Sequence, residues 1–340
     1  MKPFVVEKAQ AGQWLKDLCD TFDIFAPLPS IKGYHDWQRW DGSNLPVVRK
    51  GVPKSSIKAF FFPQPEVLFQ FNARASNPDA FRLKEPTCHP KPKILFGVRP
   101  CDARSVILNS IPYKSDPYFQ RKKEEIAIIG FLCEEGCSTC FCKWTGGSPV
   151  GKEGMDIAVI DLGQVFHIEV LSDKGEALVR PQFFREPADQ EISEAKDLIT
   201  KAQGQTLEQD AASSLRSKEL MKLYNAPFWG KISEPCINCG TCTFLCPTCY
   251  CFDIQDETLR GKGRRIRYWD SCMFPLFTQH ASGHNPRGDK LKRVRNRFMH
   301  KLKYFPDRFG PLSCVGCGRC VRECPVNIDI RQVLKDLLAT

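Results

Sequence analysis

One cysteine spacing occurs twice near the carboxyl end of this 340-residue chain and constrains its structure more than any other feature. The pattern C-x2-C-x2-C-x3-C-P appears in CINCGTCTFLCP and again in CVGCGRCVRECP, at residues 236–247 and 314–325. Three thiolates that recur every third residue can bind three irons of one cubane, and Gly240 and Gly318 ease the tight turn. The repeat therefore predicts two [4Fe–4S] clusters.

The fourth cysteine of each run is expected to cross to the other cluster, as it does in two-cluster ferredoxins with this spacing. The expected ligands of the first cluster are Cys236, Cys239, Cys242 and Cys324. The expected ligands of the second cluster are Cys314, Cys317, Cys320 and Cys246. Structural zinc is the alternative, but zinc sites usually carry two separated C-x2-C pairs, and two full copies that end in proline argue against it.

Cysteine usage and the absence of a secretory pattern indicate the compartment. Of 18 cysteines, 15 fall within 133–142, 236–251 and 314–324 or at Cys272. The first residues, MKPFVVEKAQ, carry charges where a secretory signal is apolar, and no stretch has the ~18–20 uninterrupted apolar residues of a membrane span. Clustered cysteines in such a chain indicate metal binding rather than disulfides, so we expect a cytoplasmic protein.

The formal net charge of +10 would also suit a nucleic-acid-binding protein. Each oxidised cluster with its four thiolates carries about −2, so three clusters would lower the total to about +4. The basic run 287–303 (RGDKLKRVRNRFMHKLK) lies between the cysteine motifs and has no recognisable nucleic-acid motif. We therefore expect it to dock a partner or to compensate cluster charge.

Apolar patterns predict an α+β protein with an α/β-type domain followed by a mainly helical, ferredoxin-like domain that holds both clusters. Helices are expected at 10–22 and after Pro100, with Asp102 in the first turn. Strands are expected in 59–72, 93–98 and 124–133, and a hairpin in 156–175. The expected domains are 1–185, a helical linker over 186–230 with two amphipathic helices, and the dicluster domain over 231–340, where no strand-like runs are recognised.

A third group of cysteines follows the strand expected at 124–133. The segment CEEGCSTCFC holds Cys133, Cys137, Cys140 and Cys142 within ten residues. Thiols this close together bind metal or leave the protein open to oxidation. A cluster, a zinc site and reduced buried thiols all remain open, because the spacing does not identify the ligands.

Five short motifs, in order, resemble one known family: GVRPCD (97–102), CFC (140–142), CPTCYC (246–251), WDSC (269–272) and GHNPR (283–287). The family comprises the iron–sulfur beta subunit of sulfhydrogenase-type [NiFe] hydrogenases and the corresponding iron–sulfur subunit of anaerobic sulfite reductase. Similar subunits occur in flavin oxidoreductase–heterodisulfide reductase complexes. The resemblance spans nearly the whole chain.

This resemblance implies a third cluster. The family pattern has cysteines that match Cys101, Cys133, Cys140 and Cys142, which become the preferred ligands. It has no regular counterpart of Cys137, which is therefore the rival for the fourth position. The cysteines at 249, 251 and 272 also match family positions, where they would bind a further centre or line the core as small apolar groups.

Two other patterns are set aside. GGSPVGKE (146–153) has the letters of a phosphate loop, but Glu153 follows the lysine and a strand follows the loop. No G-x-G-x-x-G motif lies between a strand and a helix, so we expect this chain to bind neither NAD nor flavin. His280 and His284 lie in a polar loop and are expected to be structural or exposed.

The favoured hypothesis is an electron-transfer subunit with no catalytic residue of its own. By resemblance, it would lie between a flavoprotein subunit linked to NAD(P)H or ferredoxin and a catalytic subunit of NiFe hydrogenase, sulfite reductase or heterodisulfide reductase type. The alternatives are a free-standing reductase that acts at the N-terminal cysteine site and a nucleic-acid-binding protein with structural clusters. An open coordination position would favour the former, and salt-dependent nucleic-acid binding the latter.

Overall fold

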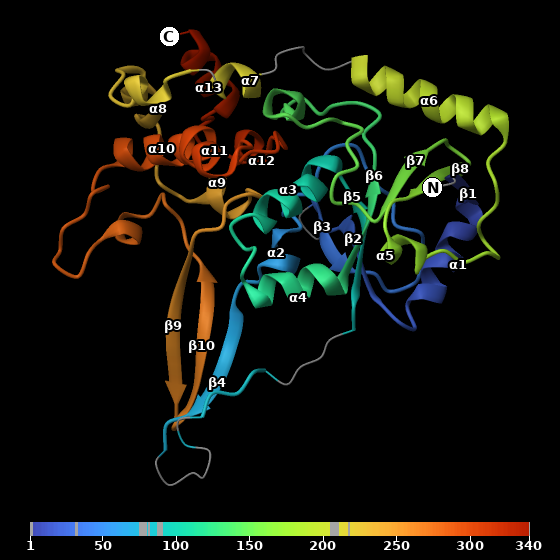
Figure 1. Cartoon of the computed structure of the whole chain (residues 1–340), viewed down its shortest axis with the longest axis horizontal. Helices are drawn as coiled ribbons and strands as arrows, with labels where there is room; N and C mark the ends of the chain where they lie inside the picture. Colours follow the sequence, from blue (N-terminus) through green and yellow to red (C-terminus); the bar gives the residue numbers. More distant parts are fainter. Residues whose placement is uncertain are drawn as a thin grey trace.

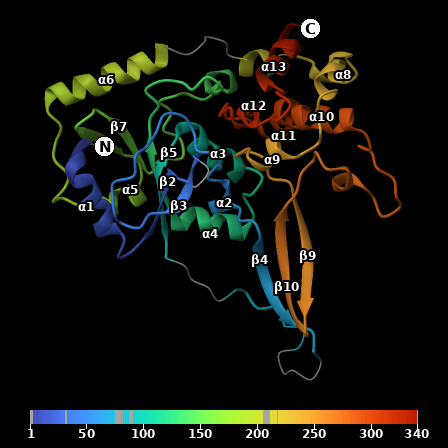
Figure 2. The same ribbon diagram turned by 180° about the vertical axis from the view of Figure 1, so that it is seen from behind.

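The structure is a computed structural model that describes residues 3–30, 33–74, 80, 82–86, 91–204, 211–216 and 218–339; Cys88 lies outside them. Figures 1 and 2 show three regions: a twisted sheet with helices against it, a helical region that contains the carboxyl end, and a long β-arm that projects away from both. The predicted mixture of helices and strands is confirmed.

The main sheet has seven strands in the order β1-β8-β7-β6-β5-β2-β3. The four strands β2, β5, β6 and β7 run parallel, while β1, β8 and β3 pair antiparallel with their neighbours. Their bounds are β1 (Pro3–Glu7), β2 (Asp23–Pro29), β3 (His35–Arg39), β5 (Lys93–Val98), β6 (Ile126–Phe131), β7 (Ile157–Asp161) and β8 (Val165–Val170). The strands predicted at 93–98 and 124–133 and the β7–β8 hairpin are confirmed.

Both faces of this sheet are buried, which explains the continuous apolar runs in its central strands. In β5, Ile94 and Phe96 face one core with Trp14 of α1, while Leu95 and Val98 face a second core on the opposite side. The helices of this region are α1 (Lys8–Leu18), α2 (Lys58–Phe61), α3 (Pro100–Ser110), α4 (Pro117–Glu125) and α5 (Asp173–Glu176). The two predicted helices are present as α1 and α3, and Asp102 lies in the first turn of α3.

The predicted helical linker begins with a long helix, α6 (Asp189–Gly204), as expected. The second expected helix is short: α7 (Ala211–Arg216) is followed by a 3-10 turn, η2 (Leu220–Leu223). Beyond them the chain forms α8 (Phe228–Ser233), α9 (Thr241–Phe244), η3 (Pro275–Thr278), α10 (Lys290–Met299), a π-helical turn η4 (His300–Tyr304), α11 (Phe305–Phe309), α12 (Arg319–Arg322) and α13 (Ile330–Ala339).

The core of the helical region includes two aromatic side chains from the N-terminal half. Phe141 precedes the 3-10 turn η1 (Cys142–Thr145) and Trp144 lies within it, and both pack in the same cluster as Trp229, Phe298 and Leu334. The N-terminal cysteine segment is therefore packed into the helical region that carries both repeated motifs.

The expectation that strands end before residue 231 is wrong. The arm in Figures 1 and 2 consists of β4 (Glu66–Asn72), β10 (Lys262–Trp269) and β9 (Phe252–Leu259), in the order β4-β10-β9. Arg260 and Gly261 both have positive φ, 51° and 82°, which is the type I′ turn that suits a two-residue hairpin. All of β9 is exposed, so it has no apolar face from which a strand is usually recognised.

Candidate iron–sulfur sites

The four cysteines predicted for the first cluster line one cavity. Cys236, Cys239 and Cys242 come from the loop before α9 and from α9 itself, and Cys324 comes from the segment after α12. Asn238 and Gly240 adopt positive φ, 56° and 75°, which turns the loop tightly around the cavity. These four predicted ligands, three from one motif and one from the other, therefore lie around one cavity together with Cys320 of the second motif.

A buried cation, Arg297, lies beside this cavity and indicates whether an anionic cluster would fit there. Arg297 of α10 is only 4% exposed and lines the cavity. Its Nη2 donates to the Cys242 carbonyl oxygen at 3.2 Å, whereas its buried Nε has no partner among the described residues. A buried N–H requires an acceptor, and the sulfur of an anionic cluster supplies one together with a counter-charge.

The electrostatics of Arg297 agree with this interpretation. Burial opposes its charge, but the thiolates of Cys242 and Cys320 outweigh that effect and hold the pKa of Arg297 above its usual value. Cys320 belongs to the second motif yet also lines the first cavity. The two cysteine sets therefore adjoin at this residue.

The cysteines predicted for the second cluster gather in the interior. Cys246, Cys314 and Cys317 are all buried. Burial raises the pKa of Cys314 to about 11 and that of Cys317 to about 12, and in both cases the nearby Cys246 contributes to the rise. Burial also raises the pKa of Cys320, with a contribution from Cys246, so Cys246 lies near all three of the other predicted ligands.

A second buried cation lies against this group. Lys301, in the π-helical turn, donates from Nζ to Cys246 Sγ at 3.3 Å, Thr248 Oγ1 at 3.1 Å and the Ser313 carbonyl oxygen at 3.0 Å. No carboxylate forms an ion pair with it in the described part of the chain. Burial opposes its charge, yet neighbouring thiolates, Cys246 foremost, raise the pKa of Lys301. A buried ammonium group whose counter-charge is sulfur fits an anionic cluster at this position.

The second motif packs backbone to backbone against the N-terminal cysteine segment. The Phe141 N–H donates to the Gly316 carbonyl oxygen at 2.8 Å. A Cβ at Gly316 would lie 2.5 Å from the Phe141 backbone, and one at Gly318 would lie 2.5 Å from the Thr139 backbone. Both positions therefore require glycine for close approach as well as for their positive φ.

A buried ion pair joins α3 to the same motif. Arg319 forms two hydrogen bonds with Asp102, at 2.6 and 2.7 Å, and neither side chain is exposed. Their neighbour Cys101 packs against Val315 and Cys317. Cys101 is thus held beside the second cluster site.

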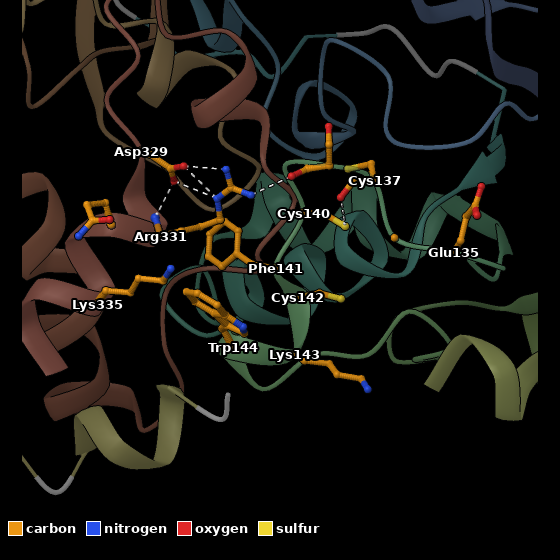
Figure 3. A pocket seen from close by; sticks show the side chains of 13 residues that line it. Glu135, Cys137, Cys140, Phe141, Cys142, Lys143, Trp144, Asp329, Arg331 and Lys335 are labelled. Carbon is orange, nitrogen blue, oxygen red and sulfur yellow. Dashed lines mark hydrogen bonds and ion pairs between the residues drawn. The ribbon is translucent and has the colours of Figure 1, made fainter. Parts of the chain in front are cut away.

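The N-terminal cysteines surround an open cavity of about 580 Å³, shown in Figure 3. Cys137, Cys140 and Cys142 line it, and Cys140 Sγ donates to the Cys137 carbonyl oxygen at 3.1 Å. Arg331 and Lys335 of α13 face the same space from the opposite wall. Three thiols and two cations thus meet where α13 passes the cysteine segment.

The preferred ligand set for a third cluster is only partly gathered around this cavity. Of the described residues, Cys133 lines an adjoining cavity with Arg49 and Arg99. Burial raises the pKa of Cys133 to about 11, with further contributions from nearby Cys142 and Cys137. Cys101 interacts electrostatically with Cys317 and with Cys133. The rival Cys137 therefore lies with Cys140 and Cys142, while Cys101 lies between Cys133 and the second site.

Comparisons with known proteins identify the chain's relatives. Residues 235–328 match the 4Fe-4S dicluster domain. The chain is 32% identical over 253 residues to sulfhydrogenase 2 subunit beta of Pyrococcus furiosus, which covers 72% of this chain and 73% of that protein. The chain belongs to the sulfhydrogenase beta-subunit family. No solved structure matches it.

Membership in the sulfhydrogenase beta-subunit family confirms the resemblance drawn from the motifs. The dicluster domain confirms two [4Fe–4S] clusters, and with the relative it supports an iron–sulfur electron-transfer subunit of an oxidoreductase. None of the described helices of this beta subunit is long and apolar enough to cross a membrane. Within the described ranges, no three His, Cys, Asp or Glu side chains converge as they would on one metal ion.

Three other features that the sequence analysis considered are the histidine pair, the segment 146–153 and the basic run 287–303. His280 and His284 are exposed and stack edge to face with ring centroids 5.3 Å apart. The segment 146–153 leads into β7, not into a helix. In the basic run, Arg293, Arg295 and Arg297 are buried, so these side chains are unavailable to a nucleic acid.

Sequence reasoning missed one further cation in this beta subunit, Lys58 of α2. Its side chain is 4% exposed and reaches across to the segment after the first motif, where Nζ donates to the Cys249 carbonyl oxygen at 3.1 Å. Burial lowers its pKa to about 8, although the Cys249, Cys246 and Cys251 thiolates act in the opposite direction. Nothing in the local sequence SSIKAFF distinguishes this lysine from a surface lysine, because its partners Thr243 and Cys249 are 185 and 191 residues away.

Proposed function

We propose that this beta subunit relays single electrons through [4Fe–4S] clusters from one partner to another within a complex, the partners being a flavoprotein and a catalytic subunit. The flavoprotein would be linked to NAD(P)H or ferredoxin. The catalytic subunit would be of NiFe hydrogenase, sulfite reductase or heterodisulfide reductase type. The observation that carries the proposal is the contact between the two cysteine sets at Cys320, since adjoining clusters allow an electron to pass between them.

A third [4Fe–4S] cluster at the N-terminal cysteines would extend this relay to an open cavity. Its proposed ligands are Cys101, Cys133, Cys140 and Cys142, with Cys137 as the rival for one position. Electrostatic contact runs from Cys142 to Cys133, from Cys133 to Cys101 and from Cys101 to Cys317. This series of thiols leads from the surface cavity to the second site, as an entry point for electrons requires.

Iron analysis of the anaerobically purified chain tests the number of clusters. Three cubanes predict about twelve irons and twelve acid-labile sulfides per chain. A count near eight with stoichiometric zinc would make the N-terminal site a zinc site and leave a two-cluster relay. A count near zero in a colourless protein would contradict the relay altogether.

Single substitutions test the ligands of the third cluster. Cys133→Ser should lower the iron content by about four, while Cys19→Ser, in the turn after α1 and away from every cavity described above, should leave it unchanged. Cys137→Ser and Cys101→Ser then identify the disputed ligand, because only the replacement of a true ligand should lower the iron content by about four. Unchanged iron in Cys133→Ser would reject the N-terminal cluster.

Native purification without oxygen tests the proposed partners and the expected cytoplasmic location. A flavoprotein and a catalytic subunit should co-purify with the beta subunit from the soluble cell fraction. Addition of NAD(P)H or reduced ferredoxin to that complex should bleach the cluster absorbance. A chain that purifies alone and is reduced by neither donor would contradict the proposed place in the complex.

A further inference from the structure

A cavity of about 400 Å³ lies at the carboxyl ends of the parallel strands β2 and β5. Pro27 of β2 and Gly97 of β5 line it together with the loop of residues 48–55, and Arg322 of α12 lines it from the second cysteine motif. None of the proposed cluster ligands lines this cavity. Ligands of open parallel sheets commonly bind outside the carboxyl ends of the strands, so a small molecule can be expected at this position.

Positive charge dominates the lining of this cavity. Among the described residues, five cationic side chains and one carboxylate line it: Arg49, Lys50, Lys54, Arg99, Arg322 and Glu323. Glu323 pairs with Arg322 at 2.8 Å, and Lys50 pairs with Glu135, which does not line the cavity. Arg49, Lys54 and Arg99 form no ion pair with any carboxylate that the structure describes. Three cations therefore converge on one space without a counter-charge from those residues.

The loop that carries Arg49 and Lys54 is held in place by three other arginines. Its carbonyl oxygens accept hydrogen bonds from Arg99 at residues 49 and 51, from Arg322 at residue 52 and from Arg319 at residues 53–55. A backbone that is ordered before binding loses little conformational entropy when a ligand binds. The loop therefore presents both cationic side chains from a preorganised backbone.

A bulge in β5 lies just before Arg99. The register of β5 against β6 shifts between Phe96 and Val98, and Gly97 has a φ of 86°. A Cβ at Gly97 would lie 3.0 Å from a methyl carbon of Val48, so glycine allows the loop to approach the strand end closely. Bulges redirect the side chains near them and are common beside functional sites. The guanidinium group of Arg99 is only 7% exposed and bonds to carbonyl oxygens, so it keeps its full charge beside the cavity.

We propose that this cavity binds the terminal diphosphate group of a small organic ligand, such as a nucleoside diphosphate. A guanidinium group binds phosphate oxygens in pairs, and an ammonium group binds them as a point charge. A terminal diphosphate carries more negative charge than a phosphate monoester or the bridging diphosphate of a dinucleotide, and therefore matches three cations best. Tyr34, which also lines the cavity and is 48% exposed, offers an aromatic ring to the organic part of the ligand.

The rival explanation for these cations is that they compensate the charge of a cluster at the N-terminal cysteines. Arg49 and Arg99 also line the adjoining cavity that Cys133 lines, but Lys54 does not. A diphosphate in the cavity would contact Lys54, whereas a cluster at Cys133 would not require it. Replacement of Lys54 therefore separates the two explanations.

Isothermal titration calorimetry of the anaerobically purified wild-type chain with ADP tests the site, in a buffer without phosphate or divalent cations. We expect one ADP to bind per chain and to be displaced by inorganic pyrophosphate but not by sulfate at the same ionic strength. NAD⁺ should compete poorly, because its bridging diphosphate carries less charge. The absence of saturable ADP binding would overturn the proposal, as would equal competition by sulfate or tighter binding of NAD⁺ than of ADP.

Matched variants locate the binding site. Arg49→Gln and Lys54→Gln should each weaken ADP binding by about tenfold, the loss expected for one charge-assisted hydrogen bond. Arg39→Gln, which removes an exposed arginine of β3 that does not line the cavity, should leave the affinity unchanged. Wild-type affinity in Lys54→Gln, or equal losses in all three variants, would overturn the proposal. All three variants should keep the wild-type iron content, which reports on the relay independently of ADP binding.

Discussion

At the scale of single residues, the position of each cation in α10 and in the turn after it decides whether it contacts a cysteine sulfur. Lys301 donates to Cys246 Sγ, while its neighbour Lys303 pairs with Asp307 at the surface at 2.9 Å. Arg295 lies over the Tyr224 ring at 3.6 Å, away from the thiols. Only Arg297 and Lys301 of these four cations therefore act on the predicted cluster ligands.

Replacing Lys301 should lower the reduction potential of the cluster that Cys246 binds. Reduction adds negative charge to a cluster, and the ammonium group stabilises that charge through a hydrogen bond to a ligand sulfur. Charge-assisted hydrogen bonds contribute ~1.5–3 kcal/mol, and 1.4 kcal/mol corresponds to 59 mV for one electron. Lys301→Met should therefore shift one midpoint by about 60 mV or more to lower potential in a titration followed by electron paramagnetic resonance.

The matched control for this change is Lys303→Met in the same turn, which removes an equal charge at a partly exposed position. It should shift the midpoints by much less, because solvent screens exposed charge. Equal shifts in both variants, or none in Lys301→Met with full iron content, would show that the hydrogen bond does not tune the cluster.

At the scale of elements, close backbone packing joins the N-terminal cysteine segment to the second motif. Gly316 and Gly310 both adopt positive φ, 62° and 94°, so alanine is strained at either position. Only at Gly316 would the new Cβ also meet backbone, 2.5 Å from Phe141 and Cys142, whereas nothing lies within 4 Å at Gly310. Gly316→Ala should therefore add an overpacking cost of ~1–3 kcal/mol to the shared strain.

The two alanine variants can be compared by the rate at which cluster absorbance is lost on anaerobic heating at one temperature. Gly316→Ala should lose it several-fold faster than Gly310→Ala, because the cysteine segment no longer covers the second site. Similar rates in the two variants would indicate that the segment does not support that site.

Helices and strands could be predicted where burial gives their sequence a recognisable run of apolar residues, and could not be predicted where they are exposed. The strands β5 and β6 lie between two apolar cores, so their apolar runs revealed them. Strand β9 is exposed along its whole length and is held by pairing with β10, including ion pairs such as Arg265–Asp256 at 2.7 Å. The sequence of β9, FDIQDETL, has no regular alternation of apolar and charged residues, which left only the Arg260–Gly261 turn as a signal.

At the scale of the whole molecule, local spacing divides the cysteines into two expected ligand sets but does not indicate what surrounds them. The crossed grouping of Cys236, Cys239, Cys242 and Cys324 followed from local spacing, and these four line one cavity. Whether they bind a cluster as proposed is for iron analysis to test. The surroundings depend on contacts distant in sequence, such as Lys58 with Cys249 and Asp102 with Arg319, which no local pattern encodes.

These distant contacts predict that residues 231–340 do not form an independent cluster domain, although the sequence suggests a boundary there. Strand β10 pairs with β4 of the N-terminal half, and Phe141 and Trp144 complete the helical core. The fragment would also lack Asp102 and the carbonyl oxygens of residues 53–55, which together bind the Arg319 guanidinium in the intact chain. A fragment of residues 231–340, expressed alone, should therefore retain far fewer than the ~8 irons of two cubanes.

Co-expression of residues 1–230 with residues 231–340 provides the control, because it restores every one of these contacts without a covalent link. The two fragments should then co-purify and recover the cluster signals of the intact chain, since the area buried between them includes a strand pairing, two aromatic anchors and an ion pair. If residues 231–340 alone hold about eight irons with those same signals, the dicluster region is autonomous and the N-terminal half is an attachment to it. If the fragments require each other, the seven-stranded sheet, the arm and the cysteine motifs are one folding unit, in which the N-terminal half supplies part of the protein environment around both clusters.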